Sequence, residues 1–291
     1  MSDKKPQITQ EPHAYTSTGE LKSIYFVSGL PRSGSTLLCN ILNQNPRFRA
    51  SATSGVLDML LIIRNNWNAI SAFKAVRNEP AKLRVIRAML YSFYADIDKP
   101  VIFDKSRGWP GYFEMAEEIL GHKAKALICV RDIRDVLASF EKLWRKESKT
   151  NQISQEKALP NNFQTVEDRC KVWLKTDQPV GNAYNKVKDA LQRGFGDRMH
   201  FVFFDELTNN PKQTMQEIYQ FLGEDYYAHD FNNVEQSTQE DDFFHGFKDL
   251  HTIRKKVAPV GSNWKEVLGP TAEQYGSLNF WDKAIRNKKK E

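Results

Sequence analysis

"VSGLPRSGSTLL" (residues 27–38) contains two glycines, Gly29 and Gly34, followed by the hydroxyl pair Ser35 and Thr36. This order fits the phosphate-binding pattern G-x-x-x-x-G-K-[ST] at every position except the lysine, which is Ser35 here. The apolar run SIYFVS precedes the loop and the helical pattern STLLCNIL follows it. The sequence predicts a strand–loop–helix unit whose backbone N–H groups bind a phosphate, without the lysine that a nucleoside triphosphate requires. A tight turn that binds no ligand is the alternative.

Three further apolar runs have the character of buried strands: PVIFD, KALICV and HFVFF, near residues 100–104, 125–130 and 200–204. Helical patterns lie between them, and Pro179 marks a break between two of these patterns. Alternating strands and helices predict an α/β, three-layer, P-loop-like fold with a central parallel sheet. We expect a flexible lead-in over residues 1–20, a single domain over residues 21–285 and a basic tail over residues 286–291.

The composition restricts the class of protein. The 291-residue chain is 40% hydrophobic and 27% charged, with 42 basic and 36 acidic residues and a net charge of +6. This surplus suits an anionic ligand but is too small to indicate nucleic acid. The cysteines Cys39, Cys129 and Cys170 form neither a disulfide framework nor a zinc motif. This cysteine pattern predicts a reducing cytoplasm, and the polar N-terminus and the lack of a long apolar run predict a soluble protein without a membrane partner.

A second candidate anion site is VRDIRDVLASF, residues 130–140. Arg131 falls at the end of a predicted strand, at the sheet edge where ligands bind in such folds. Ser139 follows eight residues later, roughly two helical turns along. The two side chains are suited to hold a second phosphate through charge-assisted hydrogen bonds. The alternative is an ion cluster of Arg131 with Asp132 or Asp135.

A third candidate is the basic cluster in TIRKKVAPVGSNWK, formed by Arg254, Lys255 and Lys256. Such a cluster is either solvated or folded over a bound anion. Lys105 in IFDKS ends another predicted strand. Its side chain either faces a ligand at the sheet edge or forms an ordinary ion pair with Asp104.

In their order along the chain, these motifs resemble the sulfotransferases that use 3′-phosphoadenosine 5′-phosphosulfate (PAPS). GLPRSGSTLL is similar to their loop for the 5′-phosphosulfate, in a form nearest to the tyrosylprotein sulfotransferases, and VRDIRDVLASF is similar to their 3′-phosphate motif. FVFFDELTNNPKQTMQEIYQFLG resembles the segment YEDL…NP…FLG, and RCKVWLK resembles the Cys–Trp helix of the tyrosylprotein branch. The basic loop before NWK resembles the closing loop of cytosolic sulfotransferases, with about three more residues in its spacing.

The resemblance implies metal-free transfer of the sulfuryl group of PAPS to a hydroxyl or amine acceptor, with 3′,5′-adenosine bisphosphate (PAP) as the product. It places Arg32 at the bridging oxygen of PAPS and Lys105 at the sulfuryl oxygens, both as catalytic residues. The implied cofactor-binding residues are Arg32, Ser33, Gly34, Ser35, Thr36, Leu37, Arg131, Ser139, Arg254, Lys255 and Lys256.

This chain lacks the general base of both branches of the family at the corresponding positions. The tyrosylprotein branch has a glutamate where this chain has Thr53, and the cytosolic branch has a histidine where it has Arg107. Asp58 is the candidate base, because burial in its apolar stretch would raise its pKa; its alternatives are a salt bridge with Arg64 or a helix N-terminal charge. We expect five histidines to be structural or exposed: His122, His200, His229, His245 and His251.

Two other functions remain open at this point: a P-loop kinase that phosphorylates a small molecule, and a non-catalytic nucleotide- or polyanion-binding module. The acceptor is not identified by the sequence, and a small molecule, a carbohydrate and a peptide are all compatible with it. Residues 54–98 and 146–164 are expected to shape the acceptor pocket. A homodimer is also compatible with the sequence.

Overall fold

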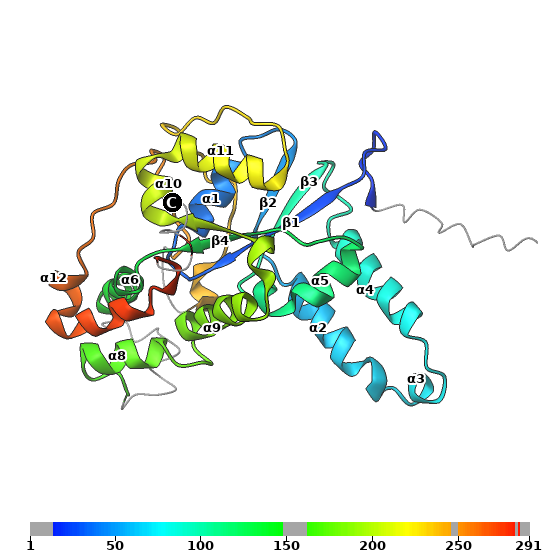
Figure 1. Ribbon diagram of the computed structural model, residues 1–291, viewed down its shortest axis with the longest axis horizontal. Coiled ribbons are helices and arrows are strands. Elements are labelled where there is room, and N and C mark those ends of the chain that lie inside the picture. The colour runs from blue at the N-terminus through cyan, green and yellow to red at the C-terminus, as the bar shows by residue number, and fades with distance from the viewer. Residues whose placement is uncertain (1–13, 148–161, 246–249, 283–284, 286–291) are drawn as a thin grey trace, which may run out of the picture.

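The computed structural model describes residues 14–147, 162–245, 250–282 and 285. Its centre is a parallel sheet of five strands in the order β2-β3-β1-β4-β5 (Figure 1). The strands are β1 (Ser23–Gly29), β2 (Phe48–Thr53), β3 (Val101–Lys105), β4 (Ala126–Val130) and β5 (Met199–Phe203). The predicted α/β class with a parallel sheet is confirmed.

Helices cover both faces of this sheet (Figure 1). The α-helices are α1 (Ser35–Leu42), α2 (Val56–Asn66), α3 (Ser71–Ala75), α4 (Glu79–Phe93), α5 (Phe113–Leu120), α6 (Ile133–Glu147), α8 (Val166–Trp173), α9 (Pro179–Gln192), α10 (Phe204–Asn209), α11 (Pro211–Leu222) and α12 (Trp264–Leu268). Short 3₁₀ turns are Trp67–Ala69, Trp109–Tyr112, Phe195–Arg198, Asp242–His245 and Pro270–Leu278. The predicted break at Pro179 is confirmed, since this residue begins α9.

The protein has two hydrophobic layers, one on each face of the sheet, because successive side chains of β1 point to opposite faces. Ile24 and Phe26 are buried on the face that packs against α2, α5, α6 and α9, and Val27 is buried on the face that packs against α1, α10 and α11. Successive side chains of a strand point to opposite faces, so a central strand buried on both faces is apolar throughout. This packing brings the carboxyl ends of β1, β3 and β4 to one edge, where the motifs meet.

One part of the chain differs from the sequence-based expectation. The edge strand β2, with the sequence FRASAT, was not predicted, because exposed Arg49 and the small polar residues that follow it interrupt the apolar pattern. Residues 1–13 of the predicted lead-in lie outside the described residues, and Tyr15 forms an antiparallel bridge with Leu21. The predicted basic tail, residues 286–291, lies outside the described residues, as do residues 148–161 of the predicted pocket loop.

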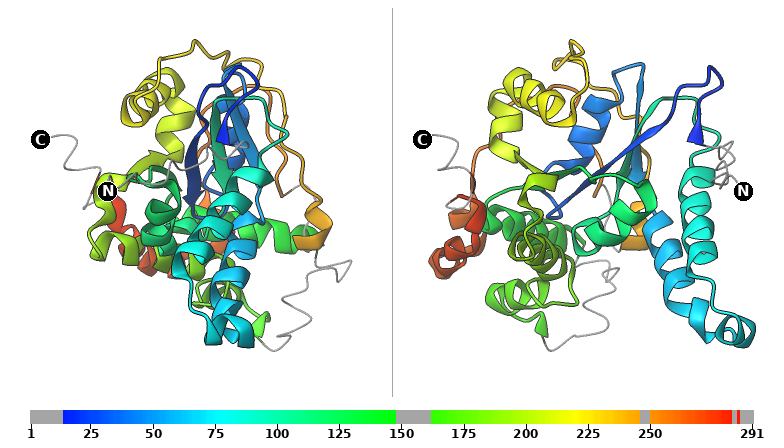
Figure 2. Two further views of the ribbon diagram at one scale, coloured as in Figure 1. Left: turned by 90° about the vertical axis from the view of Figure 1, so that its right-hand side faces the viewer. Right: turned by 45° about the vertical axis from the view of Figure 1, so that its right-hand side comes forward.

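Helices α2, α3 and α4 form an arm that extends from one end of the sheet (Figure 2). Between α11 and α12, residues 223–245 and 250–263 return to the sheet, where Val234 and Val257 pack in the same hydrophobic layer as α1 and α11. Across the described ranges 14–147, 162–245 and 250–282, no helix combines the length and the apolar character needed to cross a membrane.

Candidate active site

The loop between β1 and α1 has a shape that only glycine permits at two positions. Gly29 has φ of 117°, and a Cβ atom there would lie 2.1 Å from the backbone oxygen of Cys129. Gly34 has φ of 89°, and a Cβ atom there would lie 2.6 Å from the ring of Phe204. Both glycines therefore meet a steric requirement as well as a conformational one. The predicted phosphate loop has the tight geometry that the sequence pattern implies.

The helix α1 begins at the loop without a side-chain cap. Its N-cap residue is Gly34, which has no side chain that could accept a hydrogen bond from the first N–H groups of the helix. The Ser33 hydroxyl points inward, where it donates to the backbone oxygens of Leu30 and, at 2.9 Å, of Cys129. Ser35 and Thr36 line the adjoining pocket. The helix thus offers its positive end to an anion, while Ser33 fixes the loop rather than facing the pocket.

Arg32 has an unusual backbone conformation at the centre of the site. Its φ of 59° lies in the left-handed region, which costs a residue with a Cβ roughly 1–2 kcal/mol. The side chain is held in place because Nε donates to Ser139 Oγ at 3.0 Å and Nη1 donates to the backbone oxygen of Leu250. Such strain at a fixed side chain is typical of functional sites. Ser139, expected at a phosphate, therefore positions Arg32 in this structure.

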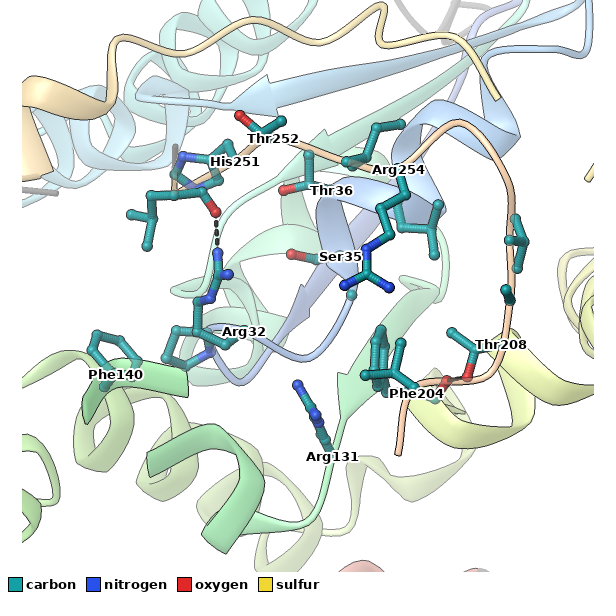
Figure 3. A pocket seen from close by; sticks show the side chains of 18 of the residues that line it. Arg32, Ser35, Thr36, Arg131, Phe140, Phe204, Thr208, His251, Thr252 and Arg254 are labelled. Atoms are coloured by element: carbon teal, nitrogen blue, oxygen red, sulfur yellow. Dashed lines mark hydrogen bonds between the residues drawn. The ribbon is translucent and has the colours of Figure 1, made fainter. Parts of the chain in front are cut away.

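Four arginines line one pocket of about 470 Å³, namely Arg32, Arg107, Arg131 and Arg254, and Figure 3 labels three of them. Arg32 comes from the phosphate loop, Arg131 follows β4, and Arg254 comes from the segment before α12. The guanidinium of Arg131 lies 4.6 Å from the ring centre of Phe204. Burial, followed by repulsion from Arg131, lowers the pKa of Arg32. None of the described lining residues is acidic, so the cations face the pocket directly, while carboxylates such as Asp242 near Arg32 and Asp205 near Arg131 lie behind its surface.

The alternative for Arg131, an ion cluster with Asp132 or Asp135, is met only in part: burial lowers the pKa of Arg131, and the nearby carboxylates of Asp135 and Asp132 oppose that change. Asp132 forms its ion pair with Arg134 at 2.6 Å, and Asp135 accepts a hydrogen bond from Ser262 Oγ at 2.9 Å. The guanidinium of Arg131 instead lines the pocket against the Phe204 ring.

The predicted basic loop contributes two of its three cations to the pocket. Arg254 and Lys256 are among the lining residues, whereas Lys255 is not. The backbone oxygen of Lys255 accepts a hydrogen bond from the N–H of Val234 at 2.7 Å. This contact fixes the basic loop against the chain that follows α11.

Lys105 ends β3 beside the phosphate loop, and its ion-pair partner is Glu240 rather than Asp104, the partner named in the alternative. Its Nζ lies 2.7 Å from Glu240 and 3.5 Å from Thr36 Oγ1. Asp104 points to the opposite face of the sheet, where it accepts hydrogen bonds from Tyr94 and Trp109. The alternative of an ion pair between Lys105 and Asp104 is therefore wrong.

Glu240 places a carboxylate next to Thr53, the position where the tyrosylprotein branch has its glutamate. Its Oε1 accepts a hydrogen bond from the backbone N–H of Thr53 at 2.9 Å as well as the bond from Lys105. Burial opposes ionisation of Glu240, but Lys105 and the N–H of Thr53 outweigh it and lower the pKa to about 2. The residue is 187 positions from Thr53, so no local motif could have indicated it.

The prediction that Asp58 is buried is wrong. Asp58 lies in the first turn of α2 and is exposed, because the buried face of this helix is formed by Val56, Leu57 and Leu60. The alternative, a solvated charge that favours the helix N-terminus, describes this residue better. His251, in contrast, was expected to have no role beyond structure, yet it is buried and lines the pocket.

The comparisons with known proteins agree with this geometry. A model of the sulfotransferase family matches residues 25–228. The fold is similar to that of the sulfotransferase domain from the Synechococcus PCC 7002 olefin synthase, with a TM-score of 0.53 and 18% identity, over 91% of this chain and 97% of that chain. It is also similar to mouse sulfotransferase SULT7A1 complexed with PAP, with a TM-score of 0.50 and 14% identity, over 96% and 91% of the two chains. Sulfotransferase STF9 from Mycobacterium avium is similar with a TM-score of 0.50 and 13% identity, over 91% of this chain and 77% of that chain. No curated protein matches the chain.

The family match covers well over half of the chain and includes Arg32, Lys105, Arg131 and Ser139. It gives no support to the kinase alternative, and it does not distinguish the tyrosylprotein branch from the others. With the phosphate loop at the end of β1 and the cations that surround it, the match establishes that the chain belongs to the sulfotransferase family.

Proposed function

We propose that this sulfotransferase uses PAPS as its donor and a hydroxyl or amine group as its acceptor. The observation that carries the proposal is the convergence of Arg32, Arg131 and Arg254 on one pocket, with no carboxylate among its described lining residues. Crowded, desolvated cations are stabilised by an anionic ligand, and two separated phosphates would neutralise them. The volume of about 470 Å³ is within the range that small-molecule sites occupy, roughly 300–1,000 Å³.

The residues divide naturally between two anionic groups. The uncapped N–H groups at the start of α1 and the Thr36 hydroxyl are placed to bind the 5′-phosphate. We assign the 3′-phosphate to Arg131 and Arg254, whose side chains both line the pocket (Figure 3). When bound, PAPS supplies an activated sulfuryl group. Arg32 and Lys105 then stabilise the negative charge that develops during transfer.

Calorimetric titration with PAP, beside ADP and magnesium, tests the donor. We expect PAP to bind without a metal and more tightly than ADP, because a 3′-phosphate adds charge-assisted bonds to Arg131 and Arg254. Arg131→Ala should weaken PAP binding by roughly 10–100-fold, the effect of losing one charged hydrogen-bonding partner.

Arg193→Ala is the control, since Arg193 pairs with Glu114 and Asp189 and is not among the lining residues. It should leave PAP binding within about twofold. Tighter, magnesium-dependent binding of ADP would contradict the proposed donor.

We also infer a reducing, cytoplasmic setting and an acceptor that is a small molecule, a carbohydrate or a peptide. The setting is supported by Cys39, Cys129 and Cys170, which are all buried free thiols. The acceptor class follows from the family chemistry, and a screen of hydroxyl and amine compounds with PAPS would identify it.

A further inference from the structure

The sulfuryl acceptor must lose a proton, and one imidazole at the pocket is built to receive it. His251 lines the pocket and is 8% exposed. Its Nδ1 lies 2.5 Å from Asp242 Oδ1, and its backbone N–H donates to Asp242 Oδ2 at 3.0 Å. Its backbone oxygen accepts a hydrogen bond from Gln236 at 3.2 Å. One carboxylate therefore holds both the ring and the backbone of His251.

Contacts on the Nδ1 side of the ring place this imidazole beside the side chains expected at the transfer site. Nδ1 of His251 lies 3.5 Å from Glu240 Oε2, and Glu240 binds Lys105, which approaches Thr36 of the phosphate loop. On its other side, the preceding residue, Leu250, accepts the hydrogen bond from Arg32. In Figure 3, His251 and Arg32 lie on the same side of the pocket, opposite Arg254.

We propose that His251 is the general base of this sulfotransferase and that Asp242 is its positioning residue. The assignment rests on the proposed sulfuryl transfer. Nδ1 of His251 donates to the Asp242 carboxylate, so the neutral ring has its basic lone pair on Nε2. Nε2 takes the acceptor proton as the acceptor oxygen bonds to sulfur. The bond from sulfur to the bridging oxygen breaks, and its electron pair remains on the 5′-phosphate of PAP beside Arg32.

The basicity of the neighbouring groups favours His251 over Glu240. Glu240, with a pKa lowered to about 2, is a poor proton acceptor at neutral pH. Burial lowers the pKa of His251 below 6.5, Asp242 and Glu240 oppose this change, and Lys105 adds to it. The ring is thus neutral near pH 7 and able to accept a proton.

His251→Ala tests the assignment in the full-length protein with PAPS and an acceptor from the screen. We expect kcat to fall by roughly 10²-fold or more, the usual contribution of a general base, while PAP binding stays within about twofold. Asp242→Asn should lower kcat less and shift the acidic limb of the pH profile to lower pH, because Asp242 raises the pKa of His251. His122→Gln is the control, since His122 precedes β4 at the opposite end of the sheet and should leave kcat unchanged.

The two proposals fail in different ways. If the wild-type protein did not bind PAP, the proposed donor would be wrong; if His251→Ala bound PAP and kept its kcat, only the base assignment would be wrong. NMR of the His251 ring provides a test that needs no acceptor. A neutral ring with its proton on Nδ1 at pH 7 is expected, and a doubly protonated ring, or one protonated on Nε2, would overturn the assignment.

Discussion

Replacing Arg32 by alanine should lower kcat for sulfuryl transfer by roughly 10²–10³-fold, the usual effect of removing one group that stabilises charge in a transition state. The guanidinium is already fixed by Ser139 and by the backbone oxygen of Leu250, so it needs little reorganisation to act. PAP binding should weaken less, by about tenfold, because the N–H groups of α1 still bind the 5′-phosphate. The measurements are release of PAP from PAPS with a hydroxyl acceptor and calorimetric titration with PAP.

The left-handed backbone at Arg32 gives this experiment an internal control. Arg32→Gly removes the same charge as Arg32→Ala, but it also relieves the strain at φ of 59°. We expect equal losses of kcat, with the glycine variant about 1 kcal/mol more stable than the alanine variant. A glycine variant that kept wild-type kcat would show that the guanidinium takes no part in transfer.

The local part of the site could be predicted from the sequence because its signals lie within a few residues of one another. Gly29, Gly34 and Thr36 form a recognisable strand–loop–helix pattern, and Arg131 directly follows an apolar run. The structure brings these residues to one edge of the sheet, as parallel strands require. A steric demand at two glycines and a helix start without a side-chain cap explain why the pattern is so specific.

The acid–base part could not be predicted, because it depends on contacts between distant segments. Thr53 and Lys105 meet Glu240 only after the chain beyond α11 folds back over the strand ends. Asp58 was favoured because its neighbours in the sequence are apolar. Helical periodicity, however, buries Val56, Leu57 and Leu60 and leaves Asp58 exposed. An apolar stretch predicts the burial of a helix face but not of every residue in it.

The ion pair of Lys105 and Glu240 should make the stability of the protein depend on pH in the acidic range. Both side chains are 8% exposed, and the pKa of Glu240 is about 2 in the folded protein against an ordinary value of 4.5. The folded state therefore binds a proton less readily than the unfolded state. This difference contributes about 3 kcal/mol above pH 4.5, which is lost as the pH falls toward 2. Urea unfolding of the wild type and of Glu240→Gln at a series of pH values would measure it.

A double-mutant cycle separates the structural role of Lys105 from its catalytic role. Lys105→Met should destabilise the protein by about 3–5 kcal/mol, because Glu240 remains buried without its cation, and should lower kcat by roughly 10²-fold. Lys105→Met with Glu240→Gln should recover most of the stability, since a glutamine can still accept the hydrogen bond from Thr53. It should not recover kcat, because the cation at the sulfuryl group is still missing. If the double variant regained both, Lys105 would serve only as the partner of Glu240, and the charge on the sulfuryl oxygens would have to be balanced by Arg32 alone.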